Sequence, residues 1–255
     1  MTVPPDMSGH SKWSTIKRKK AATDSARAKV FTKHIREITL AARAGGGDPN
    51  TNPRLRTAIG GAKSVNMPVA NIERAIQKGT GELAGSLIEE AHYEGYAPHG
   101  VAILVECATD NRNRTTSDVR LVFSKYGGSL GAAGSVSYLF RPRGLIEVPR
   151  DAASEEQLLE LALQAGADDV TTGADCFEVA TPPAAFEPVR DALTARGIPV
   201  AHAELARVAT VTVRLDESEA RAVLRVVELL EDLDDVQRVC ANFELSDEVL
   251  AKLSR

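Results

Sequence analysis

Apolar residues in the first third of the chain recur at helical spacing. The first repeat predicts a helix that ends at the glycines of residues 45–47. Its apolar positions share one face: Phe31, Ile35, Ile38 and Ala42. Asn52 and Pro53 have the residue types of the cap and first position of a second helix, and residues 66–68 begin a third. Residues 8–80 are therefore predicted to form a small helical domain.

After residue 80 the pattern changes to alternating strands and helices. Residues 100–108 are an apolar run rich in β-branched side chains, typical of a buried strand. Residues 115–126 follow with the spacing of an amphipathic helix. Further strands are expected at residues 135–140, 141–148, 169–173, 176–181, 199–205, 208–215 and 236–245, and further helices at 154–165, 184–196 and 216–233.

The order of these elements predicts the fold class. Strand 101–108 and helix 115–126 have the same plan as strand 207–215 and helix 217–231. We expect a multidomain α and α+β protein, in which a helical bundle precedes two α/β, ferredoxin-like domains, one inserted in the other. The predicted segments are a disordered leader at 1–7, a basic helical domain at 8–80, a discontinuous α/β domain at 81–135 plus 206–255, and an inserted α/β domain at 136–205.

Composition narrows the class of protein. Hydrophobic residues make up 43% of the chain and charged residues 26%, an ordinary globular balance. The sequence has no membrane-length apolar run and no secretory signal, and its three cysteines are widely separated. We therefore expect a cytoplasmic protein without a membrane partner, whose translation begins at Met1 or Met7. Metal-ligand spacing and nucleotide-binding glycine motifs are also missing from the sequence, so no metal, cofactor or small-molecule substrate is predicted.

One pattern resembles an enzyme motif. The sequence "GGSLG" at residues 127–131 fits G-x-S-x-G, with Ser129 at the nucleophile position and His202 as the only downstream histidine. A nucleophile elbow needs a strand before the serine and a helix after it. Here a helix is predicted before it and a glycine-rich loop after it, which favours a glycine turn and a non-enzymatic protein. The acidic run at 231–235 is expected to be a solvated helix end and loop.

Charge is divided unevenly along the chain. Residues 1–80 carry 15 Lys/Arg and 5 Asp/Glu, a charge of +10, and the remainder carries −14. Such a division predicts a polyanion-binding segment, because lysines and arginines release counterions from a phosphate backbone. The candidate nucleic-acid-binding residues of this basic arm are Lys12, Trp13, Lys17, Arg18, Lys19, Lys20, Arg27, Lys29, Lys33 and Arg36.

Each candidate in the arm has an alternative. Trp13 either stacks on a base or sugar or anchors the arm to the helical core. The cations either contact phosphates or form a solvated basic face without a partner. Ten cations between Lys12 and Arg43 face only two acids, however, and their mutual repulsion favours a partner.

A second candidate site is the loop at residues 110–115. It joins a strand to a helix, so Arg112, Arg114 and backbone N–H groups are expected at a helix N-terminus, where phosphates bind readily. The alternative is a local capping network in which Asn113 or Thr115 caps the helix and the two arginines pair with Glu106 or Asp118. The sequence leaves both interpretations open.

Several of these segments together resemble a known family. The stretches "GHSKWSTIKRKKAATDSARAKVFTKHIREI", "TDNRNRT", "GGSLG" and "GSVSYLF" occur in order across residues 9–140. In these motifs the chain resembles the YebC/PmpR family, which includes the mitochondrial translational activator of cytochrome oxidase. The leader "MTVPPD" departs from the family pattern.

The resemblance implies a function but leaves two versions of it. It implies no enzymatic activity and no cofactor. It implies a regulator of gene expression that binds nucleic acid, either a DNA-binding transcriptional regulator or a factor that binds ribosomal RNA in the ribosome and relieves stalls at proline-rich sequences. The sequence has no obvious helix-turn-helix, which favours recognition of shape and backbone over base edges.

Overall fold

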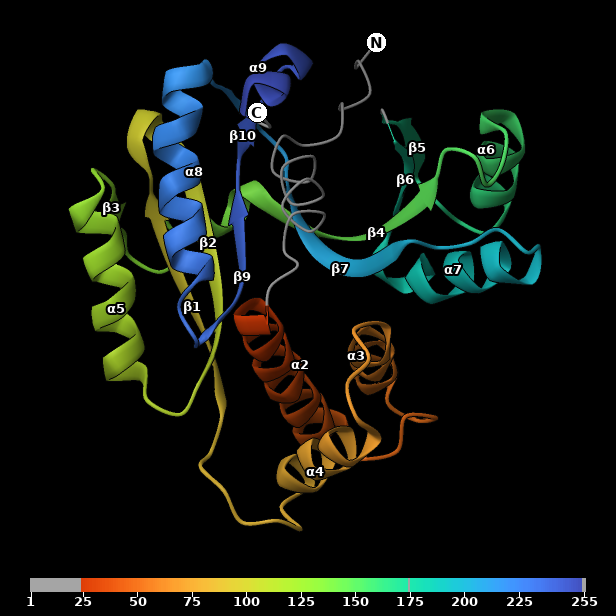
Figure 1. Ribbon diagram of the computed structural model, residues 1–255, viewed down its shortest axis with the longest axis horizontal. Coiled ribbons are helices and arrows are strands. Elements are labelled where there is room, and N and C mark those ends of the chain that lie inside the picture. Colours follow the sequence, from red (N-terminus) through yellow and green to blue (C-terminus); the bar gives the residue numbers. More distant parts are fainter. Residues whose placement is uncertain (1–23, 174, 254–255) are drawn as a thin grey trace.

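The computed structural model describes residues 24–173 and 175–253. Figure 1 shows a helical part below two sheets, one at the left and one at the right. The predicted leader at 1–7 and the first part of the basic arm lie outside the described residues. The long helix of the helical part points with its N-terminal end toward the space between the sheets (Figure 1).

The helical part contains the three predicted helices: α2 (Asp24–Gly45), α3 (Pro53–Ser64) and α4 (Val69–Thr80). Asn52 caps α3, since its side chain accepts a hydrogen bond from the Leu55 N–H at 3.1 Å. The same side chain donates to the Ala41 carbonyl at 2.8 Å, so the cap also ties α3 to α2. Helix α4 approaches α2 closely at Gly79, where an added Cβ would lie 2.5 Å from the Thr39 carbonyl oxygen.

The first sheet has the antiparallel order β3-β1-β2-β9. Its strands are β1 (Glu89–Tyr96), β2 (Ala102–Thr109), β3 (Ser129–Leu130) and β9 (Val236–Ala241). Helices α5 (Arg112–Lys125) and α8 (Glu217–Glu231) pack on one face, where Val105, Phe123 and Val227 are fully buried. Because β9 comes from the end of the chain, this sheet joins segments far apart in sequence (Figure 1).

The second sheet has the order β5-β6-β4-β7 and is also antiparallel. Its strands are β4 (Phe140–Pro149), β5 (Asp169–Thr172), β6 (Cys176–Thr181) and β7 (His202–Ala209), with α6 (Glu155–Gln164) and α7 (Phe186–Ala195) between them. Its connectivity is the β-α-β-β-α-β pattern of the ferredoxin-like motif. Ile146, Leu158 and Leu193 form its buried centre.

Smaller elements complete the described chain. They are the 3₁₀ turns η1 (Pro98–Gly100), η2 (Ser137–Leu139) and η3 (Pro183–Ala185), the parallel pair β8 (Val213–Arg214) and β10 (Phe243–Glu244), and α9 (Asp247–Leu253). A small apolar cluster links the two sheets, in which Leu104 and Cys240 from the first meet Phe140 from the second. Arg207 also pairs with Glu106 at 2.7 Å across this junction.

The predicted fold class is confirmed: N-terminal helices precede two α/β sheets of antiparallel strands. The predicted strand at 135–140 is wrong: residues 137–139 form a 3₁₀ turn, and the N–H groups of Val136 and Ser137 bond to the buried carboxylate of Glu94 on β1. The strand predicted at 208–215 is interrupted after Ala209. The domain boundaries remain predictions. Strand β7 runs across the boundary that was placed between residues 205 and 206.

Candidate nucleic-acid interface

The predicted binding residues fall into two groups. Those of the first group lie outside the part of the chain that the structure describes: Lys12, Trp13, Lys17, Arg18, Lys19, Lys20 and the side chain of Arg27. Those of the second group are described: Lys29, Lys33 and Arg36 on α2, and Arg112 and Arg114 at the start of α5. The structure brings members of the two predicted sites together, because Arg36 and Arg114 meet at the same carboxylate.

The two lysines of α2 contact the end of α8. The Lys29 Nζ lies 3.2 Å from both the Asp232 carboxylate and the Asp232 carbonyl oxygen. The Lys33 Nζ donates to the Glu231 carbonyl at 3.0 Å. Carbonyl oxygens at the C-terminal end of a helix carry partial negative charge, so this is a favourable place for ammonium groups.

Arg36 lies deeper and joins α2 to the first sheet. Its Nη1 donates to the Ala108 carbonyl at 3.1 Å and to the Asp234 carbonyl. The same nitrogen lies 2.8 Å from the Asp235 Oδ1, although its hydrogens point to the two carbonyls. The Asp235 contact is therefore mainly a charge interaction, in a place where the two side chains are only 17% and 6% exposed.

Asp235 collects further partners on its other oxygen. Oδ2 accepts hydrogen bonds from Arg114 and from the Thr115 hydroxyl, both at 2.7 Å, and from the Thr109 hydroxyl at 3.2 Å. Burial raises the pKa of the Asp235 carboxyl, but these hydrogen bonds and the charge of Arg36 outweigh burial and hold the pKa below its usual range. Asp235 is therefore a charged anchor inside the protein, and the expectation of a solvated loop at 231–235 is wrong for this residue.

The loop at residues 110–115 forms a local network. Asn111 caps α5 by accepting from the Arg114 N–H at 3.1 Å. Arg112 pairs with Glu89 at 3.1 Å and donates to the Glu90 carbonyl at 2.9 Å. This matches the capping alternative in kind, but the cap is Asn111, not Asn113 or Thr115, and the acids differ from those expected.

A hollow of about 500 Å³ lies over this network. Its lining residues are Arg36, Asp110, Arg114, Thr115, Asp118, Asp232, Leu233, Asp234 and Asp235. Aspartates outnumber arginines in this lining, so its electrostatic potential does not favour a phosphate group. Among the described residues, no group of three or more His, Cys, Asp or Glu side chains has an arrangement that would hold a metal ion. The geometry is that of a structural clamp between α2 and the first sheet.

Four exposed cations of the helical part were not among the predicted residues. Arg56 and Lys63 lie seven residues apart on α3, and Arg74 and Lys78 lie four apart on α4. These spacings place each pair on one helix face. None of the four forms an ion pair with another described residue. The sequence held the signal, because each pair lies off the apolar stripe of its helix.

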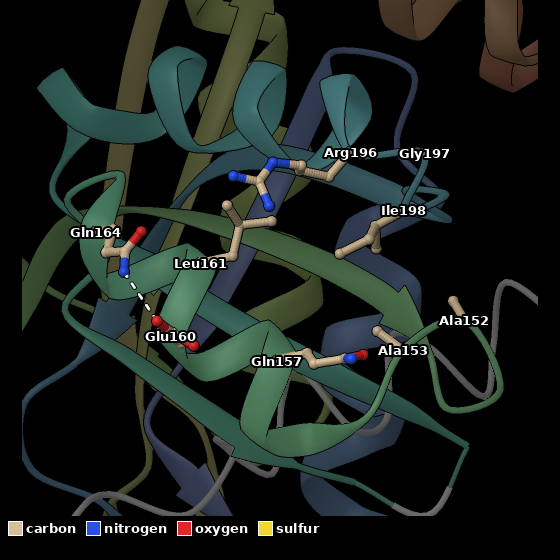
Figure 2. Close-up of a pocket in the computed structure, with 9 residues that line it drawn as sticks. All are labelled: Ala152, Ala153, Gln157, Glu160, Leu161, Gln164, Arg196, Gly197 and Ile198. Carbon is tan, nitrogen blue, oxygen red and sulfur yellow. Dashed lines mark hydrogen bonds between the residues drawn. The ribbon is translucent and has the colours of Figure 1, made fainter.

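A second hollow, of about 410 Å³, lies between α6 and α7. Figure 2 shows the Arg196 guanidinium above Leu161 and the Glu160 carboxylate hydrogen-bonded to Gln164, at 3.1 Å. The other lining residues are Ala152, Ala153, Gln157, Gly197 and Ile198. This lining contains one cation, one acid and two amides, with no serine, cysteine or histidine to act as a nucleophile or base.

Ser129 has a different setting from a nucleophile elbow. Helix α5 ends before it, Gly127 has a φ of 77°, and the Gly128 N–H bonds to the Phe123 carbonyl at 2.9 Å. Residues 131–136 after the serine are loop. The motif therefore forms a glycine turn, as expected, and lacks the strand-turn-helix context of the elbow.

The described chain thus combines a basic helical part with two antiparallel α/β units, and a charged clamp joins the helical part to the first of these units. Comparison with models of protein families identifies the family of this chain. A model of the TACO1/YebC N-terminal domain matches residues 11–82, and a model of the TACO1/YebC second and third domains matches residues 88–243. The chain belongs to the TACO1/YebC family, which confirms the resemblance seen in the sequence.

Similar proteins extend over nearly the whole chain. Relatives from Syntrophus aciditrophicus and Geobacter sulfurreducens are 55% and 56% identical over 249 and 247 residues, covering 97% of this chain and 100% of each relative. Both carry the name "probable transcriptional regulatory protein". The crystal structure of a conserved hypothetical protein from Aquifex aeolicus is 52% identical, with a TM-score of 0.85, over 94% of this chain and 99% of that one. None of the described helices has the length and apolar character needed to cross a membrane.

Proposed function

We propose that this protein is a non-enzymatic regulator of gene expression that binds nucleic acid, acting as a DNA-binding transcriptional regulator. The observation that carries the proposal is the charge division of +10 in residues 1–80 against −14 in the remainder. A positive segment attracts the phosphate backbone while the acidic remainder repels it, so the protein binds with its helical part leading. The names of the relatives agree with this role.

The described contacts divide the cations by task. Arg36 and Arg114 are held by Asp235, so their contribution is to hold the helical part in place. We assign to phosphates the cations of the basic arm between residues 12 and 20 and the exposed pairs on α3 and α4. This assignment adds Arg56, Lys63, Arg74 and Lys78 to the candidates of the arm.

A second candidate function is a translation factor that binds ribosomal RNA. The cation pairs on α3 and α4 lie on two separate helices. Such an arrangement suits contacts with backbone phosphates, which position a protein without reading base sequence. This favours recognition by shape, as is usual for structured RNA.

The salt dependence of binding tests the proposed interface. The variant with Lys17, Arg18, Lys19 and Lys20 changed to alanine should bind a DNA duplex more weakly. Its log–log salt slope should be smaller by up to about 0.9 for each lost phosphate contact. The double variant Arg74→Ala with Lys78→Ala should show a smaller effect of the same kind. The matched control is Arg196→Ala with Lys252→Ala, two exposed cations of the acidic remainder, which should leave the slope unchanged. Equal slopes in all four proteins would refute the interface.

One competition experiment separates the two candidate targets. Binding to a promoter duplex, a random duplex and purified ribosomes is compared at one physiological salt concentration. Strong preference for the promoter duplex supports the transcriptional regulator. Cosedimentation with ribosomes, together with equal affinity for the two duplexes, supports the translation factor.

A further inference from the structure

The glycine-rich loop after β3, at residues 131–136, is held by hydrogen bonds to the buried carboxylate of Glu94. Glu94 on β1 is almost fully buried, and its side chain accepts hydrogen bonds from the N–H groups of Gly134, Val136 and Ser137 at 2.7, 2.7 and 2.8 Å. Its main-chain carbonyl accepts from the Gly131 N–H at 2.7 Å. The carboxylate thus holds three backbone N–H groups of the loop and the carbonyl of the same residue holds a fourth, which restrains the loop despite its glycines.

Apolar packing and further hydrogen bonds also hold the end of this loop. Val136 and Phe140 insert into the cluster between the sheets. The Leu139 carbonyl accepts hydrogen bonds from the N–H and hydroxyl of Thr210, at 2.8 and 3.0 Å. The residue in the middle of this anchored segment is Tyr138, and it is 71% exposed.

Tyr138 has no role in the core. Aromatic residues are only 4% of the chain, and the described phenylalanines are all buried or half-buried. Tyr138 is the most exposed large hydrophobic side chain in the described part of the molecule. A tyrosine presented on a rigid backbone offers a large contact area at a low cost in conformational entropy, which is typical of a binding residue.

The charge around this loop differs from that of the acidic remainder. Between Asp118 and Glu147 the chain has no acid and four cations: Arg120, Lys125, Arg141 and Arg143. Arg143 pairs with Asp168. Arg141 is exposed, three residues after Tyr138, and forms no ion pair with another described residue. The end of the loop and the start of β4 therefore carry an exposed aromatic ring, Tyr138, and an exposed guanidinium, Arg141, three residues apart.

We propose that Tyr138 and Arg141 form a binding site for an unpaired nucleotide, in which the ring stacks on the base and the guanidinium contacts a phosphate. This rests on the proposed nucleic-acid-binding function and names the form of nucleic acid. A base inside a duplex is already stacked on both sides, so only an unpaired base offers a free face to the ring. The ligand class is a single-stranded segment or a loop of RNA or DNA.

Binding of two RNA probes tests this site. The probes are a fluorescein-labelled 12-nucleotide single-stranded RNA and a blunt 12-base-pair RNA duplex, each titrated with the full-length protein. Tyr138→Ala should weaken binding of the single strand about 5- to 150-fold, the range for one lost stacked base. It should leave duplex binding unchanged, and Tyr138→Phe, which keeps the ring, should bind both probes as the wild type does. Leu121→Ala removes another exposed apolar side chain, on α5, and should change neither affinity.

Each other outcome has a distinct meaning. If Tyr138→Ala binds both probes normally while the four-residue arm variant binds both weakly, the stacking site is refuted and the proposed function stands. If Tyr138→Ala weakens both probes equally, stacking on an unpaired base is refuted. If Tyr138→Ala instead loses a copurifying protein, the loop is a protein-binding surface. If the wild-type protein binds no nucleic acid, both proposals fail.

Discussion

The charged clamp at Asp235 makes a quantitative prediction about stability. Asp235→Asn keeps the shape of the side chain and removes the charge that two arginines share. Losing one partner of a buried ion pair costs about 3–5 kcal/mol. We expect the lower end, about 3 kcal/mol, because Arg114 is half-exposed and keeps its ion pair with Asp110, at 2.9 Å, when Asp235 loses its charge. With a urea m-value of about 3 kcal/mol/M, the unfolding midpoint should fall by about 1 M.

The assay is urea denaturation at pH 7 followed by circular dichroism. Asp232→Asn is the matched control, since it removes the same kind of charge three residues away. Its side chain is 67% exposed and its ion pair with Lys29 lies at the surface, so the expected loss is at most about 1 kcal/mol. Equal midpoints for the two variants would refute the clamp, because burial would then make no difference to the energy of the pair.

Two further predictions concern packing and pH. Gly79→Ala places a methyl group 2.5 Å from the Thr39 carbonyl oxygen and should cost about 1–3 kcal/mol. By contrast, Gly60→Ala on α3 meets no atom within 4 Å and should be neutral or stabilising in thermal denaturation; destabilisation by both changes alike would contradict the close approach. Burial raises the pKa of the Glu94 carboxyl, but three backbone N–H groups outweigh it and bring the pKa below 4.5. The stabilisation from Glu94 is therefore present above pH 4.5 and is lost as pH falls through the lowered pKa. As pH falls from 4.5 through the lowered pKa, the difference in unfolding free energy between wild type and Glu94→Gln should shrink. A constant difference would show that Glu94 does not titrate as described.

The sequence predicted the local elements because their signals are local. The apolar stripe of α2 and the Asn52 cap both lie within a few residues of the element that they define. Strand β1 was missed because it has few apolar residues and carries the buried Glu94. The N–H groups that make this acid acceptable lie 40 or more residues further along the chain, so nothing near Glu94 indicates its burial.

The candidate site was predicted less completely, for the same reason. Arg36 and Arg114 are cations of the kind that bind phosphates, so the sequence made them candidates. Nothing in the sequence shows that both pair with Asp235. The exposed pairs on α3 and α4 were visible as cations off an apolar stripe, yet they are sparse beside the dense charges of the arm. Charge density along a sequence thus indicates the segment that we propose to bind a polyanion, while the individual contacts depend on pairings far apart in the chain.

The ion pairs of the clamp can form only after Asp235 has been synthesised. Arg36 leaves the ribosome long before its partner, since its hydrogen bond to Asp234 spans 198 residues. At about 5–20 residues per second, about 10–40 s separate the synthesis of Arg36 from that of Asp234. Strand β9, which completes the first sheet, arrives directly after Asp235. Until residues 235–241 have been made, Arg36 lacks its carboxylate partner and one edge of β2 lacks its neighbouring strand β9.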